Sequence, residues 1–579
     1  MIRMSTRERQ ISTTVLVIGT GGSGLRAAIE IAEHGIDVLA VGKRPRQDAH
    51  TSLAAGGINA ALGTMDADDS WQQHAADTIK ESYLLANPHT VEIVTQGAER
   101  GIRDLERWGM DFAREDDGRI SQRFFGAHTF RRTAFAGDYT GLEIQRTLVR
   151  KAEQLEVPIL DHVYITRLLV RDNVVFGAYG FDQADGTRYL IHADAVILAA
   201  GGHNRIWRRT SSRRDENTGD SFRLAVDAGA RLRDPELVQF HPSGIIEPEN
   251  AAGTLISEAA RGEGGILRNA LGERFMEKYD PERMELSTRD RVALAAYTEI
   301  QEGRGTENGG VWLDVSHLPR ETIMTRLPRV YQTMMELQML DITTDPIEIA
   351  PTAHYSMGGV WVRPEDHQTD VEGLYAIGEA SSGLHGANRL GGNSLIELLI
   401  YGRIVGQAAM AHAAGLDAQR RSPEAVAQAR SEIADLLAAD GRENVRALQR
   451  AIRNLMTEYA GVVRSEEGLR AGLADLDMIE GRMEDIGIHP DIAGFQDLAH
   501  AFDLKASALA ARATLEAALE RRETRGCHNR SDFPDSDPTL QVNLVWSPRT
   551  GVTRESIPEI PGEIAELMRE VDTEGKLVE

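Results

Sequence analysis

The sequence has almost no cysteine: Cys527 is the single one among 579 residues. One thiol cannot form a disulfide within the chain, so a disulfide-stabilised framework is excluded. Iron–sulfur clusters usually need about four cysteine thiolates. We therefore expect no cluster and no other metal site in this chain, and electron transfer through clusters would need a partner chain.

Long hydrophobic runs are also missing. No apolar stretch approaches the roughly 18–20 residues that a membrane-spanning helix needs. The first residues, MIRMSTRERQISTTVLVIG, contain basic side chains but no apolar core of a signal peptide before the first expected strand. We therefore expect the chain to reach a membrane only through other subunits.

Positive charge is scarce: 64 Lys and Arg residues face 89 Asp and Glu residues, which gives a net charge of −25. This balance disfavours nucleic acids and anionic membrane surfaces as main partners. An anionic substrate would need a local basic pocket. The length suggests about three to five structural units, and 41% hydrophobic residues suffice for substantial cores.

A βαβ unit opens the chain. A β-branched run over 14–18 is followed by the glycine pattern at Gly19, Gly21 and Gly24, by a helical pattern over 25–34 and by a second strand over 36–41. Glycines in this position let a pyrophosphate approach the backbone and the free N–H groups of the helix. The placement between strand and helix predicts a dinucleotide site.

The unit departs from the simple NAD fingerprint, because Gly42-Lys43-Arg44 stands where an acidic residue is expected after the second strand. Two further strand patterns, ADAVILAAGG at 193–202 and VEGLYAIGEASSG at 371–383, also end in glycine-rich turns. Several strands that return to one glycine-rich site favour an FAD-binding domain interrupted by an insertion.

Five longer motifs appear in order along the chain: HTSLAAGG (50–57), QFHPSG (239–244), SEAARGEGG (257–265), APTAHYSMGG (350–359) and HGANRLGGNSL (385–395). With them the sequence resembles the flavoprotein subunit of the succinate dehydrogenase and fumarate reductase family, to which L-aspartate oxidase is related. The resemblance covers about 14–410 and, more weakly, RGCHNRSDFP near 526–534.

The resemblance implies FAD as cofactor, bonded covalently through His50. Such a bond withdraws electrons and would make the flavin a better oxidant. The other cofactor-binding residues that it implies are Gly19, Gly21 and Gly24 at the pyrophosphate, Lys43 and Thr51 on the approach to the ring, Gly57, the acids Asp220 and Glu379, and Ser394 and Leu395 at the flavin edge.

The same motifs imply a C4-dicarboxylate substrate held by His241, Ser257, His354 and Arg389, where the family more often has Thr in place of Ser257. Burying two carboxylates requires cationic partners, and the guanidinium fork of Arg suits them. Arg289 matches the family's proton donor and acceptor, and Glu258 and Arg261 match its proton relay. Succinate would lose a proton to Arg289 and a hydride to FAD.

We therefore predict an α/β fold class with a Rossmann-like FAD-binding domain over 1–235 and 345–410, interrupted by an α+β capping domain over 236–344. A helical domain over 411–525 and a C-terminal extension over 526–579 follow. Apolar residues at helical spacing predict amphipathic helices in 422–440 and 504–526, with Ser422 as a start and Gly526 as a stop. The tail after residue 535 has no clear match.

The leading hypothesis is the catalytic subunit of a succinate dehydrogenase at the cytoplasmic face of the cell membrane, with an iron–sulfur subunit and membrane anchor subunits as partners. Fumarate reductase, running the reverse reaction, and L-aspartate oxidase are the alternatives. AAGGINAAL and AGDYTGLEI lean towards the oxidase, and His50 leans against it. A degenerate flavin scaffold would lack carboxylate-binding residues, and these are present.

Overall fold

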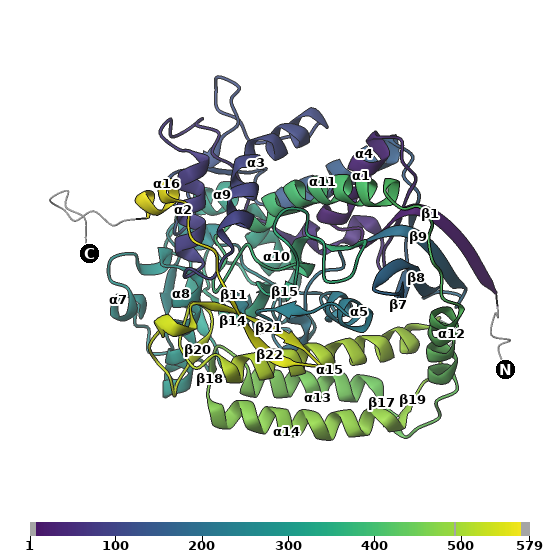
Figure 1. Cartoon of the computed structure of the whole chain (residues 1–579). Helices are drawn as coiled ribbons and strands as arrows, with labels where there is room; N and C mark the ends of the chain where they lie inside the picture. The colour runs from purple at the N-terminus through teal and green to yellow at the C-terminus, as the bar shows by residue number, and fades with distance from the viewer. Residues whose placement is uncertain (1–6, 491–493, 569–579) are drawn as a thin grey trace.

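The protein is described by a computed structural model over residues 7–490 and 494–568 (Figure 1). Residues 1–6, which belong to the segment where no signal peptide is expected, lie outside the described residues. The end of the predicted C-terminal extension, 569–579, also lies outside them. The described residues form a seven-stranded sheet, two four-stranded sheets, three smaller sheets of two or three strands, and a layer of helices.

The largest sheet has seven strands in the order β6-β2-β1-β9-β8-β7, with β16 added beside β9. Strands β6 (Ile159–Leu160), β2 (Val38–Val41), β1 (Glu8–Ile18), β9 (Arg188–Leu198) and β16 (Leu374–Ala376) run parallel to one another. Strand β8 (Val174–Asp182) runs antiparallel to both of its neighbours, β9 and β7 (Val163–Arg171). The run Val15–Ile18 is buried on both faces, as central parallel strands require.

Helices cover this sheet. Helix α1 (Gly22–Glu33) follows β1 directly and packs against α11 (Asn393–Ala414) and α4 (Thr140–Gln154), and α11 in turn packs against α3 (Pro88–Arg107). By length and composition α11 could cross a membrane, but 61% of its most apolar stretch is buried inside the protein. It is therefore placed as a core helix, and Glu397 and Arg403 interrupt its apolar residues.

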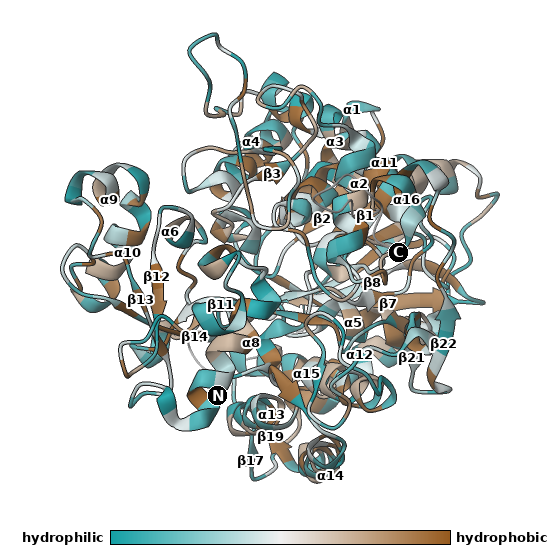
Figure 2. Cartoon of the chain, turned by 90° about the vertical axis from the view of Figure 1, so that its left-hand side faces the viewer, coloured by the Kyte–Doolittle hydropathy of each residue, from teal (hydrophilic) through white to brown (hydrophobic). Residues whose placement is uncertain are grey.

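A second, antiparallel sheet has the order β11-β14-β13-β12. Its strands are β11 (Val238–Ile245), β12 (Ile266–Arg268), β13 (Val311–Asp314) and β14 (Ile347–Ser356), and the helices α8 (Arg289–Glu299), α9 (Arg320–Arg326) and α10 (Pro328–Gln338) accompany it. Figure 2 shows apolar colour on the strands of both sheets. Strand β14 lies beyond residue 344, yet it pairs with β11 and β13. The domain boundaries themselves stay predictions.

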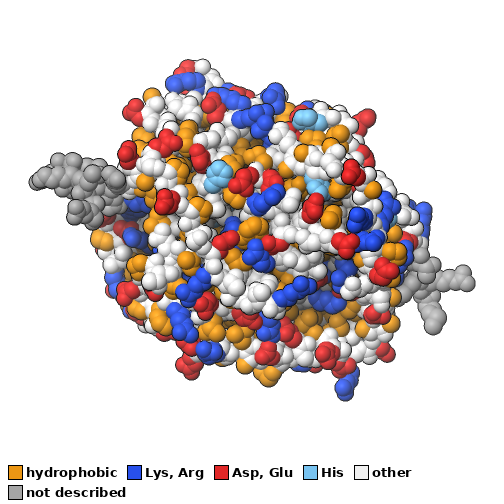
Figure 3. Space-filling model, in the orientation of Figure 1, with side chains coloured by type: hydrophobic (Ala, Val, Ile, Leu, Met, Phe, Trp, Pro, Cys, Tyr) orange, Lys and Arg blue, Asp and Glu red, His pale blue; other side chains and the backbone are white. Residues whose placement is uncertain are grey.

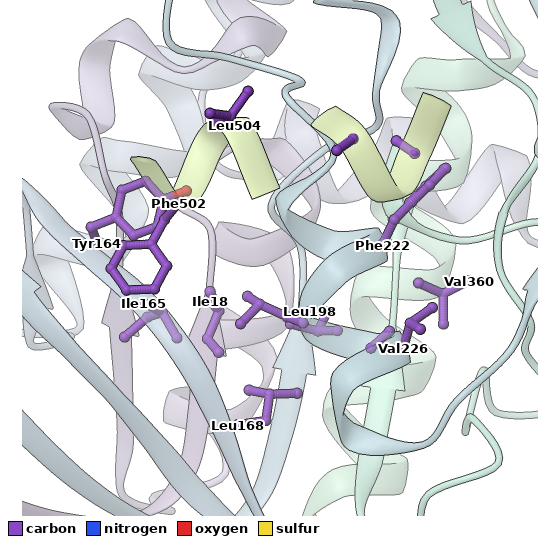
Figure 4. Packing of buried hydrophobic residues seen from close by; sticks show 14 of the residues in the cluster. Ile18, Tyr164, Ile165, Leu168, Leu198, Phe222, Val226, Val360, Phe502 and Leu504 are labelled. Carbon is purple, nitrogen blue, oxygen red and sulfur yellow. The ribbon is translucent and has the colours of Figure 1, made fainter. Parts of the chain in front are cut away.

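The helical layer contains α12 (Pro423–Leu437), α13 (Val445–Tyr459), α14 (Glu466–Arg482) and α15 (Gln496–Glu520). Helices α13, α14 and α15 pack side by side (Figure 1). Phe502 of α15 packs on Tyr164 of β7, with ring centroids 5.9 Å apart, and both lie near Ile18 and Leu198 at the ends of β1 and β9 (Figure 4). The helical layer thus supports the carboxyl end of the main sheet.

The sequence predicted the start of α12 correctly, because the Ser422 side chain accepts a hydrogen bond from the Ala425 N–H. The predicted stop at Gly526 was wrong. Helix α15 ends at Glu520, and Arg521 leaves helical geometry to reach a cluster of buried carboxylates. The predicted α/β architecture, with an α+β insertion and a following helical part, is confirmed.

The C-terminal segment is also structured. Strands β21 (Val542–Ser547) and β22 (Gly551–Ser556) form a hairpin that extends a sheet with β10 (Leu232–Arg233) and β15 (Gly359–Val360). The short helix α16 (Gly562–Leu567) packs against α2 (Trp71–Glu81). On the face in Figure 3, acidic and basic side chains are interspersed.

We expect Arg521→Ala to lower the free energy of unfolding by about 3–5 kcal/mol, because it strands buried charges. Arg521 is fully buried and pairs with Asp234 (3.1 Å), Glu236 (2.7 Å) and Glu523 (3.2 Å). Denaturant unfolding followed by tryptophan fluorescence measures the change. Arg470→Ala, which removes an exposed pair with Glu466, is the control and should cost less than about 1 kcal/mol. Equal losses would contradict the prediction.

Candidate active site

One large cavity, about 2180 Å³ in volume, opens where the two sheets and the helical layer meet. It is lined by the glycine turn after β1, the segment 43–57, the inner strands of the second sheet and the start of α11. All the predicted site residues line it except Gly24 and Arg261, which lie behind its wall. The structure thus brings the residues of five separate motifs to one place.

The glycines of the turn have different constraints. Gly19 has φ +117°, and a Cβ there would meet the Ala199 carbonyl oxygen at 2.1 Å. A Cβ on Gly24 would meet the Gly19 oxygen at 1.9 Å. A Cβ on Gly21 would find Thr51 Oγ1 at an ordinary 3.4 Å. Gly19 and Gly24 are therefore required by strand–helix packing, whereas Gly21 keeps the cavity wall open beside the first N–H groups of α1.

Lys43 and Asp220 form an ion pair of 2.5 Å at one end of the cavity. Asp503 of α15 lies 3.4 Å from Lys43 Nζ, and the Tyr164 hydroxyl lies 2.9 Å from Asp220 and 2.8 Å from Asp503, so it can donate to either carboxylate. Burial alone would raise the pKa of Asp503, but the Lys43 charge and the hydrogen bonds hold it well below its usual range. The cluster fixes Lys43 as a cation.

His50 lies on a 3-10 turn (His50–Leu53) whose neighbour Thr51 accepts a hydrogen bond from the Gly22 N–H. His50 Nδ1 is 2.6 Å from Glu216 Oε2. Glu379 lies at the same end of the cavity, where its carboxylate accepts from the Ser356 N–H at 3.0 Å. Burial raises the pKa of Glu379 above its usual range.

Arg389 is buried, and no carboxylate of the described residues, 7–490 and 494–568, forms an ion pair with it. Its guanidinium donates to Ser394 Oγ (3.0 Å) and Gln239 Oε1 (3.0 Å) and lies over the Tyr355 ring. Burial and the nearby Arg289 charge lower its pKa to about 10. Within the part of the chain that the structure describes, its Nε has no hydrogen-bond partner. A buried, unneutralised guanidinium favours an anionic ligand.

Arg289, the first residue of α8, also lines the cavity. Its Nε and Nη2 each lie 2.9 Å from Glu258 Oε2, and Arg261 Nη2 lies 3.7 Å from that oxygen. Burial would raise the pKa of Glu258, but the charges of Arg289 and Arg261 lower it to about 2. Arg261 Nη1 donates to the Glu285 carbonyl at 2.6 Å. Arg289, predicted as the proton donor and acceptor, and the two predicted relay residues, Glu258 and Arg261, thus lie next to one another.

His241 on β11 and His354 on β14 face each other, with ring centroids 5.4 Å apart. Burial and the arginine charges hold the pKa of both imidazoles well below the usual range, so both are neutral at pH 7. Ser211 Oγ lies 2.9 Å from His354 Nδ1. Ser257 lines the cavity beside them, and its hydroxyl accepts from the Ala259 N–H at 3.3 Å.

Three residues of the site were missed in the sequence. Gln239 is fully buried, and its Oε1 accepts from Arg389 (3.0 Å) and Arg289 (3.4 Å). Gln239 stands two residues before His241 on one strand. Because side chains alternate along a strand, this spacing could have indicated that both point to the same face. Glu216 and Asp503 had no comparable signal, because their partners His50 and Lys43 are far away in the sequence.

The arrangement suits a long, partly anionic cofactor and a small dianion. The open wall at Gly21 and the first turn of α1 fit a pyrophosphate, and the segment from Lys43 to Gly57 leads on to the cluster of Arg289, Arg389 and the two imidazoles. Two guanidiniums close together repel each other unless negative charge lies between them. The site can therefore desolvate and orient a substrate with carboxylate groups beside a bound flavin.

Comparison with known proteins supports this assignment. The family profile described as FAD binding domain matches residues 14–395, and the profile described as Fumarate reductase flavoprotein C-term matches 449–561. The second match includes most of the tail after residue 535, for which the sequence alone suggested no counterpart. That expectation was wrong.

The chain is 40% identical to a fumarate reductase (CoM/CoB) chain of Methanothermobacter marburgensis, over 92% of this chain and 96% of that protein. It is 36% identical to the succinate dehydrogenase flavoprotein subunit of Rickettsia bellii, over 90% of each. The quinol fumarate reductase FrdA chain of E. coli superposes with a TM-score of 0.90 at 31% identity, covering 96% of this chain and 97% of that one. The chain is therefore an FAD-dependent oxidoreductase and belongs to the family of succinate dehydrogenase and fumarate reductase flavoprotein subunits.

Proposed function

We propose that the protein is the flavoprotein catalytic subunit of a succinate dehydrogenase, which oxidises succinate to fumarate. The observation that carries the proposal is Arg389, a buried guanidinium without a carboxylate partner among the described residues, beside Arg289 in the flavin cavity. Two carboxylates of a C4 diacid would neutralise this charge, since bidentate pairing with guanidinium offsets the cost of their desolvation.

In this proposal the cofactor is held by the residues of the cavity wall. Gly19, Gly21 and Gly24 shape the pyrophosphate turn, and Lys43, with Asp220 behind it, presents a fixed positive charge. The remaining contacts are assigned to Thr51, Gly57, Glu379, Ser394 and Leu395. Bound FAD would supply the hydride acceptor, and the chain supplies orientation and charge.

The substrate is assigned to Arg389, His241, His354 and Ser257. The neutral imidazoles donate hydrogen bonds without adding charge, so that the two guanidiniums match the two carboxylates. Once Arg289 has lost its own proton to Glu258, it is placed to take the proton from the carbon beside the one that loses a hydride. An arginine is an unusual base because its pKa is normally above about 12. Glu258 and Arg261 behind it would pass the proton on.

We further propose a covalent bond between FAD and His50, and electron transfer onward to an iron–sulfur subunit, because this chain has one cysteine. Attachment to the cytoplasmic face of the cell membrane would then belong to anchor subunits. The similarity to a chain of a quinol fumarate reductase supports the proposal that electrons pass on to partner subunits.

Fumarate reduction is the second candidate direction. It is favoured by one observation, the 40% identity to a protein named as a fumarate reductase. L-Aspartate oxidase is the third candidate; it holds FAD without a covalent bond, so His50 argues against it.

The direct experiment is a dye assay of the purified holoenzyme in both directions. We expect succinate to reduce an electron-accepting dye, and fumarate to oxidise a reduced dye, with L-aspartate inactive in both. The ratio of the two rates at equal driving force decides the direction. FAD-loaded protein that turns over neither diacid would overturn the proposal.

We predict that Arg389→Gln lowers kcat/KM for succinate by about 10²–10³-fold, because removing one partner of a buried charge pair costs about 2–5 kcal/mol. Succinate-dependent dye reduction measures it, and the flavin absorbance per chain should not change. Arg363→Gln, which removes a surface pair with Asp366, is the matched control and should stay within about twofold. Comparable losses in both variants would contradict the assignment of Arg389.

We predict that Gln239→Leu lowers kcat/KM by about tenfold or more, since both active-site guanidiniums lose an acceptor and hydrogen bonds to charged groups contribute about 1.5–3 kcal/mol. Steady-state assays over a range of succinate concentrations measure it. Gln332→Leu removes an exposed contact with Glu336 and is the control. An unchanged kcat/KM in Gln239→Leu would show that the hydrogen bonds from Arg389 and Arg289 to Gln239 do not position the two arginines.

A further inference from the structure

His50 is held by a carboxylate that the motifs of the family resemblance did not include. The His50 ring Nδ1 lies 2.6 Å from Glu216 Oε2, and the Glu216 side chain is 6% exposed. A short contact between an N–H and a carboxylate fixes which ring nitrogen carries the proton. With Nδ1–H bound to Glu216, the lone pair of the neutral ring stands on Nε2, the free end of the imidazole.

The loop that carries Glu216 is tied to the segment that carries His50. Arg213 donates to the Asp48 carbonyl oxygen and, at 3.3 Å, to Glu216 Oε1. Arg44, three residues after the end of β2, lies 3.7 Å from the same oxygen. Two cations thus hold Glu216 ionised: burial would raise the pKa of its carboxyl, but His50, Arg213 and Arg44 lower it below the usual range. The contact to His50 is therefore made by a fixed carboxylate.

We propose that Glu216 is the positioning residue for the covalent attachment of FAD to His50, because it holds Nδ1–H and stabilises the positive charge that develops on the ring. This rests on the covalent link of the proposed function. The attachment is a self-modification of the chain and is separate from the succinate reaction. Glu216 contacts none of the residues that are assigned to the substrate. The same pairing of carboxylate and imidazole activates nucleophiles and metal ligands in other enzymes.

Atoms and electrons balance in this attachment. His50 Nε2 gives its electron pair to a methyl carbon on the flavin ring and forms a carbon–nitrogen bond. One proton leaves that methyl group, and one leaves Nδ1 through Glu216. The flavin ring takes up both protons and the two electrons of the broken carbon–hydrogen bond, so it is left reduced. Fumarate, the oxidised member of the proposed substrate pair, then accepts two electrons and two protons and becomes succinate.

The charged groups around His50 set its pH dependence. Glu216 and Glu379 face it from the 204–217 loop and the turn after β16, Arg213 opposes them, and His354 approaches from β14. Burial lowers the pKa of His50, but the two carboxylates raise it above the usual range. Because a protonated ring has no lone pair on Nε2, attachment should speed up as pH rises through this raised pKa and then level off.

The test is a time course of attachment in the flavin-depleted full chain after addition of FAD and fumarate, from about pH 5.5 to 9. Intact mass of the denatured protein counts chains that have gained one FAD, and in-gel fluorescence confirms it. The wild type should gain the mass, and His50→Ala should not. Non-covalent FAD binding and the thermal unfolding temperature are recorded for every variant, so a misfolded one is recognised.

In Glu216→Gln we expect the plateau rate to fall at least about tenfold, since second partners of histidine ligands typically contribute 10–100-fold. Its rising limb should move to lower pH, because the charge that raises the His50 pKa is gone. Glu216→Ala should lose the orientation as well and be slower still. Glu249→Gln, an exposed carboxylate on the same cavity wall without contact to His50, is the matched control and should keep the wild-type rate and profile.

The outcomes separate the two claims. Wild-type attachment with an unchanged rate and pH profile in both Glu216 variants overturns the role of Glu216 alone. A slower rate without movement of the rising limb also overturns it, because a merely structural effect would give that pattern. A wild type that gains no FAD mass overturns the covalent link itself, and the inference with it.

Discussion

The constraint on which the site depends is the burial of the Arg389 guanidinium without an ion-pair partner among the carboxylates of residues 7–490 and 494–568. Arg389 is enclosed by Tyr355, Ser394 and Gln239, all neutral, and Arg289 lies beside it, paired with Glu258. Desolvating a guanidinium in this way costs free energy that the protein alone does not regain. The site is therefore poised for an anion, and in the proposed function the carboxylates of a small diacid supply the missing negative charge.

The fold keeps these charges in place by using different elements for each. Arg289 starts α8, Arg389 precedes the first turn of α11, and Gln239 and His241 come from β11. The flavin side of the cavity is built from the main sheet and its first helix. Because the two halves come from different sheets, a shift of one sheet against the other would change the distance between the flavin and the bound substrate. Closure of the second sheet over the cavity would also exclude water.

Much of this could be predicted from the sequence, and the parts that failed have physical reasons. The glycine turn and the five motifs are local, so their residues were assigned without knowledge of the fold. Asp503 could not be found, since the contact with Lys43 joins positions 460 residues apart. Gly526 was taken for a helix stop on propensity, whereas the buried charge of Arg521 ends α15 earlier. Strand β14 lies beyond the boundary that was predicted at residue 344, but it pairs with β11 and β13, because strand pairing across a sheet leaves no mark in local motifs.

The position of Asp503 has a consequence for biosynthesis. The carboxylate that fixes Lys43 belongs to α15, and Phe502 beside it packs under the main sheet. A nascent chain that has emerged only as far as α11 already contains every glycine of the dinucleotide turn, but its cofactor pocket lacks this wall. A chain truncated before α15 would therefore carry all five motifs but lack the carboxylate that fixes Lys43, so a complete cofactor pocket can form only after this helix has been made and has docked.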